Sequence, residues 1–220
     1  YLDLLTALFA TVLLVSNVAS TKLVVLGPFT FDGGTLLFPL AYIFGDVLTE
    51  VYGYRKSRRV IWIGFFALLL ATLTFQAVAH LPAPPDAESQ RFGEAFGLLL
   101  GLTPRIVLGS LLAYFLGEFA NAYVLAKLKV RTEGRFFWLR ALASTLVGQG
   151  LDTGVFLLVA FYGVFPKEVL LAVFLSNYAF KLGVEALMLP FTYAVVGFLK
   201  RAEGMDAYDR DTDFNPFRLT

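Results

Sequence analysis

The 220-residue chain is too apolar and too poor in charge for an ordinary soluble domain. Hydrophobic residues make up 58% of it and charged residues 16%, and its mean hydropathy is +0.71. A soluble domain carries about 25% charged residues, which help to cover its surface. The net charge of +1 excludes an overall attraction to nucleic acid, and the absence of cysteine excludes disulfides and thiolate metal sites. We therefore expect an all-α protein embedded in the lipid bilayer.

Six apolar runs are candidates for membrane spans, each of which needs about 20 residues. The predicted spans are Leu2–Ser20, Thr35–Tyr52, Val60–Ala79, Ile106–Leu128, Trp138–Val164 and Val169–Leu199. The first run lacks a signal-peptide cleavage site, so we interpret it as a retained span. Because the sequence starts at Tyr1 rather than Met, we expect native residues before it. Residues 27–34 predict an extended turn, residues 92–102 a re-entrant or interfacial segment, and Pro190 a kink.

The distribution of Lys and Arg predicts the orientation of the spans. Thirteen basic residues lie in the two loops after the second and fourth spans, with their flanks, and in the polar tail, whereas the opposite loops hold four. Basic residues accumulate on the cytosolic side of membrane proteins. We therefore predict a six-transmembrane-helix bundle with both termini inside (N-in, C-in). Residues 1–200 would form its single domain and residues 201–220 a polar cytosolic tail.

Polar side chains inside the predicted spans recur at helical spacing, which places them on shared faces. A charge at mid-bilayer costs about 2.5–3.5 kcal/mol, so such residues should face the bundle interior. We therefore expect one central polar cavity that binds a small solute. The alternative, that single residues only hold the helices together, remains open. The candidate binding residues are Asn17, Phe38, Tyr42, Asp46, Glu50, Glu118, Asn121, Gln149, Asp152, Asn177 and Lys181.

The predicted cavity contains more acids than bases. Five carboxylates on the inward faces stand against one lysine, Lys181, so they cannot all be neutralised within the protein. Lys181 could form a structural ion pair with Glu185, Asp152 or Asp46. Alternatively, it could be a switchable partner that releases a carboxylate when the solute enters.

Particular stretches of the chain resemble a known family. Residues 35–54 read TLLFPLAYIFGDVLTEVYGY, and 58–62 read RRVIW. The similarity continues through 138–140 (WLR), 144–147 (STLV), Gln149, 151–153 (LDT), 161–163 (FYG), Asn177-Tyr178 and Lys181. Across essentially all six spans the chain closely resembles the queuosine precursor transporter family, earlier grouped as vitamin uptake transporters.

The resemblance implies a six-helix fold similar to the substrate-binding subunits of energy-coupling-factor transporters. It also implies import of 7-cyano- or 7-aminomethyl-7-deazaguanine across the bacterial inner membrane for tRNA queuosine salvage. Glu118 matches the family pattern less well than the other acids. Asp46 or Asp152 would then read the guanine-like edge, while Gln149 and Asn17 satisfy the remaining polar atoms. Phe38 or Tyr42 would stack on the ring, worth about 1–3 kcal/mol, and Glu50 or Glu118 would handle a proton.

Other classes of function remain as alternatives. A substrate-capture subunit for another vitamin-like heterocycle would need an ATP-driven module from a partner, since the chain has no Walker A motif. An intramembrane enzyme is disfavoured by the absence of HExxH and GxSxG motifs. We expect no cofactor, no metal and no nucleic-acid partner. A homodimer is left open, because Gly109, Ala113 and Gly117 form a small-residue face that can pack within or between chains.

Overall fold

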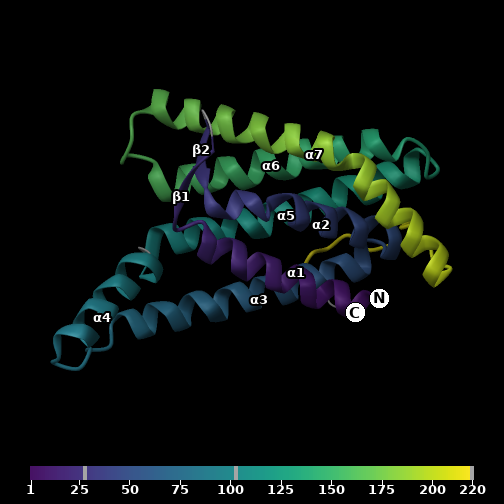
Figure 1. The fold of residues 1–220 in the computed structure, drawn as a ribbon. Coiled ribbons are helices and arrows are strands. Elements are labelled where there is room, and N and C mark those ends of the chain that lie inside the picture. Colours follow the sequence, from purple (N-terminus) through teal and green to yellow (C-terminus); the bar gives the residue numbers. More distant parts are fainter. Residues whose placement is uncertain (27–28, 102–103, 219–220) are drawn as a thin grey trace.

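The protein is a bundle of long helices with one small β-hairpin (Figure 1). The computed structural model describes residues 1–26, 29–101 and 104–218. The helices are α1 (Leu2–Ala19), α2 (Phe38–Tyr52), α3 (Tyr54–Ala79), α4 (Ala87–Leu100), α5 (Pro104–Arg131), α6 (Phe137–Phe161) and α7 (Lys167–Glu203). The remaining elements are β1 (Leu23–Leu26), β2 (Phe29–Asp32) and the 3₁₀ turn η1 (Gly33–Leu36). Both termini lie at the same end of the bundle as the C-terminal end of α7 (Figure 1).

In the part of the chain that the structure describes, five helices are long and apolar enough to cross a membrane: α1, α3, α5, α6 and α7. This confirms the predicted class, an all-α membrane protein, in its coarse form. Helix α2 differs, because its 15 residues rise only about 22 Å, less than the roughly 30 Å of a hydrocarbon core. It packs against α1, α3, α5 and α7, and it is enclosed from residue 45 to its end. Helix α2 is therefore the central element of the bundle.

The segment predicted as an extended turn, residues 27–34, belongs in part to the β-hairpin. Strands β1 and β2 pair antiparallel, with Leu23 opposite Asp32 and Leu26 opposite Phe29. Residues 27 and 28 lie outside the described part of the chain. The β-branched residues Val24 and Val25 favour a strand, which explains why the backbone pairs here.

The basic cluster at 55–59 lies inside a helix rather than in the predicted loop. Gly53, with φ of +80°, ends α2, and α3 begins at the next residue. A residue with a side chain would be strained at this φ, and its Cβ would lie 3.1 Å from the Cβ of Ala207. The abrupt reversal at Gly53 therefore brings the start of α3 directly beside the end of α2.

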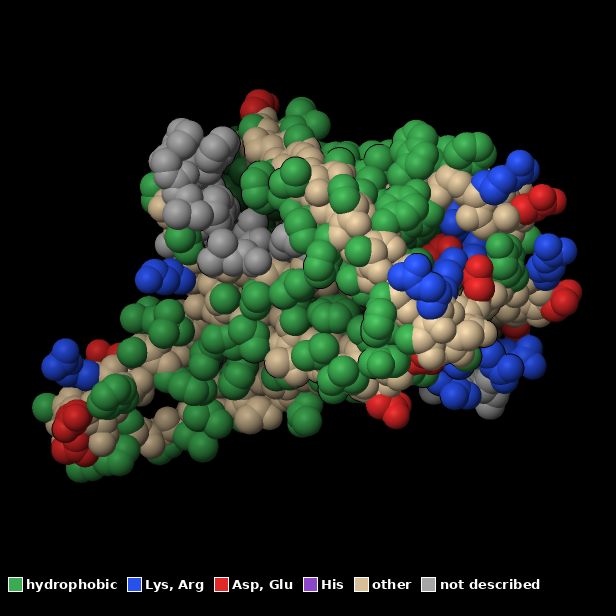
Figure 2. Space-filling model, turned by 45° about the vertical axis from the view of Figure 1, so that its right-hand side comes forward, with side chains coloured by type: hydrophobic (Ala, Val, Ile, Leu, Met, Phe, Trp, Pro, Cys, Tyr) green, Lys and Arg blue, Asp and Glu red, His purple; other side chains and the backbone are tan. Residues whose placement is uncertain are grey.

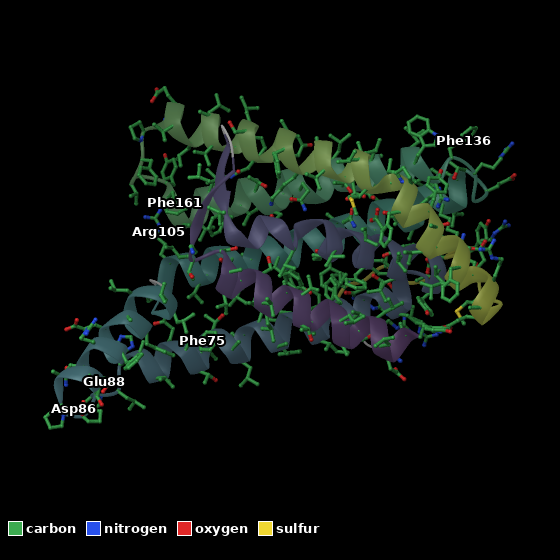
Figure 3. The ribbon with its side chains drawn as sticks, in the orientation of Figure 1. Phe75, Asp86, Glu88, Arg105, Phe136 and Phe161 are labelled. Atoms are coloured by element: carbon green, nitrogen blue, oxygen red, sulfur yellow. The ribbon has the colours of Figure 1, made fainter. Side chains whose placement is uncertain are left out.

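Helices α3 and α4 form a hairpin that extends away from the rest of the bundle (Figure 1). Figure 3 places Asp86 and Glu88 near its tip, where the carboxylate of Asp86 accepts a hydrogen bond from the Ser89 amide at 2.8 Å and caps α4. The predicted re-entrant or interfacial segment 92–102 coincides largely with the C-terminal half of α4, where Leu98 is exposed. Helix α4 packs on α3, so its outer apolar side chains face the surroundings.

The segment after α7 is a strap, residues 205–217, that lies across the ends of α2 and α3. The backbone amide of Tyr54 donates to the Asp209 carboxylate at 2.9 Å, and the Ala207 amide donates to the Val51 carbonyl at 3.1 Å. The Trp62 indole donates to the Pro216 carbonyl at 2.8 Å. The sequence predicted only a polar tail, whereas these bonds fix the strap from Ala207 to Pro216.

Acid is expected to loosen the strap at its first anchor, Asp206. Burial alone would raise the pKa of Asp206, but hydrogen bonds from Lys129 and Lys200 outweigh burial and lower it. Because the pKa of Asp206 is lower in the folded state, its ionised carboxylate stabilises the docked strap at any pH above its unfolded pKa of about 3.9. This stabilisation is lost as the pH falls through the folded-state pKa. The change should therefore appear below about pH 4.

Trp62 can report this loosening through its bond to the strap. In a Trp138→Phe background Trp62 is the sole tryptophan, and its fluorescence should shift on acidification. The same titration with Asp206→Asn added should show a smaller shift. Identical titrations with and without Asp206→Asn would contradict the role of Asp206.

Candidate functional site

Helices α5 and α6 approach closely, and this approach positions most of the polar side chains in the bundle. A Cβ on Gly117 would lie 2.8 Å from the Cβ of Asp152, and a Cβ on Gly148 would lie 2.8 Å from the Cβ of Asn121. Glycine at both positions lets the two backbones come together. The predicted small-residue face, which includes Gly117, therefore packs within the chain against α6.

Around this contact, four helices contribute side chains to what we call the central polar cluster. Helix α2 contributes one acid, α5 an acid and an amide, α6 a hydroxyl, an amide and an acid, and α7 a base and an acid. The members of the cluster are Asp46, Glu118, Asn121, Thr145, Gln149, Asp152, Lys181 and Glu185.

Asp46 lies at the inner end of the cluster and is fully buried. The Asn121 amide donates to its Oδ1 at 3.1 Å, and the Glu185 carboxyl from α7 lies within hydrogen-bonding reach. The Glu118 carboxylate is close as well, since its Oε2 lies 3.4 Å from the Cβ position of Gly45. Three acids from three helices therefore meet beside one amide.

Lys181 completes the more open side of the cluster. Its Nζ lies 3.0 Å from Oδ2 of Asp152 and 3.4 Å from Oγ1 of Thr153. The Lys181 and Asp152 side chains are 23% and 31% exposed. Of the partners considered for Lys181, the structure selects Asp152, and this pair is reachable from outside.

The cluster contains polar oxygens that lack partners. Within the described residues, buried side-chain oxygens without a hydrogen bond are Asp46 Oδ2, Asn121 Oδ1, Thr145 Oγ1, Gln149 Oε1 and Glu185 Oε1. Buried polar atoms are normally satisfied, so such a group of orphans calls for an explanation. Every one of these oxygens can accept a hydrogen bond. The cluster can therefore bind a solute that brings N–H donors or positive charge.

Glu50 does not join this cluster. It lies one turn further along α2, where Arg140 binds its carboxylate through two bonds of 2.6 and 3.2 Å. Lys200 lies 2.8 Å from it and Lys129 3.6 Å, and both lysines also contact Asp206. We call these five residues the Glu50 ion cluster. Because three cations already neutralise Glu50, the geometry favours a structural role, and its predicted role in binding stays untested.

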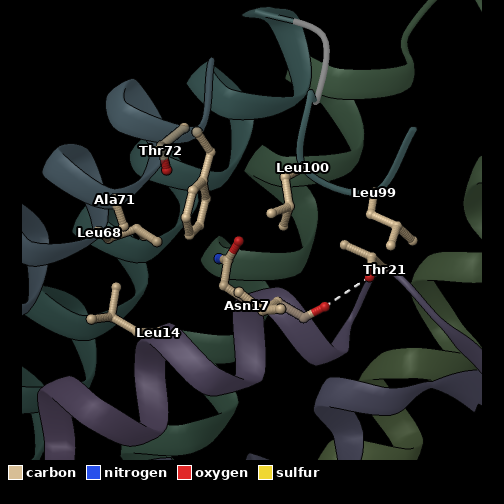
Figure 4. A pocket seen from close by; sticks show the side chains of 10 residues that line it. Leu14, Asn17, Thr21, Leu68, Ala71, Thr72, Leu99 and Leu100 are labelled. Atoms are coloured by element: carbon tan, nitrogen blue, oxygen red, sulfur yellow. Dashed lines mark hydrogen bonds between the residues drawn. The ribbon is translucent and has the colours of Figure 1, made fainter. Parts of the chain in front are cut away.

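Asn17 is also separate from the central polar cluster. It lines a cavity of about 100 Å³ between α1, α3 and α4, and Figure 4 shows its amide among apolar side chains such as Leu68 and Leu100. A second hollow lies at the tip of the α3–α4 hairpin. Both hollows are away from Asp46, so one central polar cavity remains a prediction.

The other candidates divide into three groups. Asp46, Glu118, Asn121, Asp152 and Lys181 come together as described, and Gln149 lies one turn before Asp152 on the same face of α6. Asn177 is exposed on α7, and its predicted role in binding stays untested. Phe38 and Tyr42 have side chains outside the described part, so stacking on them stays a prediction.

The predicted candidates did not include Glu185 and Thr145, which the structure adds. Both lie at i+4 spacing from a candidate, Glu185 from Lys181 and Thr145 from Gln149. That spacing was the available signal. Both are buried, with relative exposures of 2% and 0%.

The far side of the bundle has a simpler arrangement. Figure 3 places Arg105, at the start of α5, close to Phe161 at the end of α6. The Arg105 guanidinium donates to the carbonyls of Val159 and Tyr162. These carbonyls lack helical partners at the end of α6, so Arg105 caps that helix rather than serving the central polar cluster.

Comparison with known proteins places the chain beside bacterial transporters. A family model described as "Putative vitamin uptake transporter" matches residues 32–195. The "Probable queuosine precursor transporter" of Bacillus subtilis (strain 168) is 36% identical over 188 residues, which cover 84% of this chain and 80% of the relative. The "Queuosine precursor transporter" of Escherichia coli (strain K12) is 27% identical over 168 residues, which cover 74% of this chain and 71% of the relative. No solved structure matches the chain.

Proposed function

The chain belongs to the vitamin uptake transporter family, and from this premise we propose that it imports queuosine precursors. The substrates would be 7-cyano- and 7-aminomethyl-7-deazaguanine, carried across the bacterial inner membrane for tRNA queuosine salvage. The names of the Bacillus subtilis and Escherichia coli relatives support this substrate class. The family is one of transporters rather than enzymes.

The observation that carries the proposal is the group of buried oxygens without partners. A 7-deazaguanine presents a ring N–H beside an amino group, and one carboxylate can accept both. Asp46 suits this role because its Oδ2 is unpaired and its Oδ1, which accepts one bond from Asn121, has a second lone pair. Donors for the keto oxygen of the base are available from Gln149 and Lys181. We thus assign the guanine-like edge to Asp46 and the keto oxygen to the α6–α7 side of the cluster.

We further propose six crossings, with α2 as the sixth and both termini in the cytosol. Basic side chains gather at the end of the molecule that holds the start of α3 and the end of α7 (Figure 2). Such clustering is typical of a cytosolic face. Helix α2 would span with help from η1 and the β-hairpin, since α2 alone is short. We also propose that the fold resembles that of the substrate-binding subunits of energy-coupling-factor transporters.

Uptake is expected to fall at least about tenfold in Asp46→Asn and in Asp152→Asn. Each change removes a carboxylate from the cluster, and a hydrogen bond to a charged group contributes about 1.5–3 kcal/mol. The measurement is queuosine in tRNA of cells that cannot synthesise the precursor and are given it externally. Glu168→Gln, an exposed acid in the first turn of α7, is the control and should transport normally.

Normal uptake in both aspartate variants at matched expression would contradict the assignment. The same proteins purified into liposomes, without any ATP-driven module, repeat the measurement. Uptake by the unaltered protein in these liposomes would exclude a capture subunit that depends on ATP.

A further inference from the structure

Glu185 faces Asp46 in the central polar cluster, and the proposed binding scheme gives it no role. The Glu185 side chain is 2% exposed and that of Asp46 is 0% exposed. The two carboxyl groups, from α7 and α2, lie within hydrogen-bonding reach of each other. Each has one oxygen without a partner, Oε1 of Glu185 and Oδ2 of Asp46. Two acids from different helices are thus held together in the interior.

The helices packed around this pair bring no cation to it within the described residues. From α5 come the acid Glu118 and the amide Asn121, and from α6 comes Asp152, whose carboxylate is bound by Lys181 of α7. None of the ion pairs found joins a cation to Asp46 or Glu185. The pair therefore has hydrogen bonds but no compensating charge.

The charged groups on the other neighbouring elements are engaged or distant. On α2 itself, Glu50 is neutralised by the cations of the Glu50 ion cluster. On α3, Arg58 donates to the strap carbonyls of Asp213 and Asn215. On α1, the charged side chain is Asp3, exposed in the first turn.

Two carboxylates this close in a water-poor interior repel each other, so both cannot be ionised at once without a cation. A proton held between them removes the repulsion, because the protonated acid donates a hydrogen bond to its neighbour. A bound cation can do the same. Protonation and cation binding are therefore alternatives at this pair.

We propose that Asp46 and Glu185 form a proton-sharing carboxyl pair at which the ammonium group of an aminomethyl substrate replaces the shared proton. This inference rests on the proposed function and specifies how the site distinguishes its two substrates. When the cationic base binds, the carboxyl O–H bond breaks and one proton leaves to water. Asp46 then accepts the ring N–H and the amino group, and the neighbouring Glu185 carboxylate accepts the ammonium. One positive charge enters as one leaves. The neutral cyano base brings no ammonium, so the pair keeps its proton and offers one carboxylate to the N–H edge.

Calorimetry on the purified full-length chain counts the protons released. Binding of each base is measured in two buffers that differ in heat of ionisation, since proton release adds the buffer heat to the binding heat. We expect about one proton per 7-aminomethyl base bound and about none for the 7-cyano base. Glu185→Gln should abolish the proton release. It should weaken binding of the aminomethyl base at least about tenfold more than binding of the cyano base. The control, Glu168→Gln on the same helix, should behave as the unaltered protein. Equal proton release by Glu185→Gln and the unaltered protein would overturn the inference.

A second measurement needs no substrate and separates this inference from the proposed function. Infrared absorption of the ligand-free protein detects protonated carboxyl groups. The double variant Asp46→Asn/Glu185→Gln should lose absorption that the unaltered protein shows at neutral pH. If neither base binds, the proposed function fails, and this spectrum still decides the pair. Equal protonated-carboxyl absorption in both proteins would show that the pair holds no proton.

Discussion

Replacing Glu50 with glutamine is expected to lower the free energy of unfolding by about 3–5 kcal/mol, the usual cost of removing one partner from a buried ion pair. Glu50 and Arg140 are both 1% exposed and joined by two hydrogen bonds. Without the Glu50 carboxylate, Arg140, Lys129 and Lys200 would face one another with only Asp206 to neutralise them. The measurement is a denaturant titration in detergent micelles.

Two further variants test this explanation. The double variant Glu50→Gln/Arg140→Gln restores the original excess of one positive charge, so it should be more stable than Glu50→Gln alone. The control, Glu133→Gln, removes a surface acid whose pair with Arg135 is exposed, so its effect should stay within about 1 kcal/mol. Equal stability of Glu50→Gln and Glu133→Gln would show that the Glu50 ion cluster contributes little.

Replacing Gly117 with alanine is expected to lower the free energy of unfolding by about 1–3 kcal/mol and to impair uptake. The new Cβ would lie 2.8 Å from the Cβ of Asp152 and 3.0 Å from the Gly148 carbonyl. The carbonyl belongs to the backbone and cannot rotate away, so α5 and α6 must separate. Asp152 would then move relative to Glu118, and the central polar cluster would lose its geometry. Transport assays and unfolding titrations measure the two effects.

Gly183→Ala is the matched control, because nothing lies within 4 Å of a Cβ at this position of α7. An alanine there removes backbone freedom without a clash, so stability should stay level or rise by up to about 1 kcal/mol. If Gly117→Ala and Gly183→Ala behave alike, the close approach of α5 and α6 is not required.

The sequence predicted the class of fold and the inward faces that carry Asp46 and Asp152, because both depend on local patterns. Apolar length predicts helices in lipid, and the i+4 step from Tyr42 to Asp46 predicts one helix face. The β-hairpin and the uninterrupted start of α3 were missed. Each depends on backbone geometry that composition does not reveal. At the start of α3 this geometry is the positive φ of Gly53.

The separation of three candidates from the central polar cluster has equally specific causes. Each i+4 step advances about 40° around a helix, so Asn177 lies about 80° from Glu185 although both belong to one stripe. This rotation leaves Asn177 exposed while Glu185 is buried. Periodicity likewise predicts that Asn17 and Glu50 face inward, but not which neighbours they meet. Those neighbours, α3 and α4 for Asn17 and Arg140 for Glu50, are set by tertiary packing.

The strap has a consequence for the order in which the protein is made. It follows α7 in the chain, so it is synthesised after every helix it covers. Until it arrives, Arg58 lacks its acceptors at Asp213 and Asn215, and Lys129 lacks the Ala207 carbonyl. With both termini in the cytosol, as proposed, both cations can stay hydrated at the end of the nascent bundle during this time, and neither has to cross lipid. Insertion into the membrane and burial of these charges are thus separate events in biogenesis, with the strap completing the second.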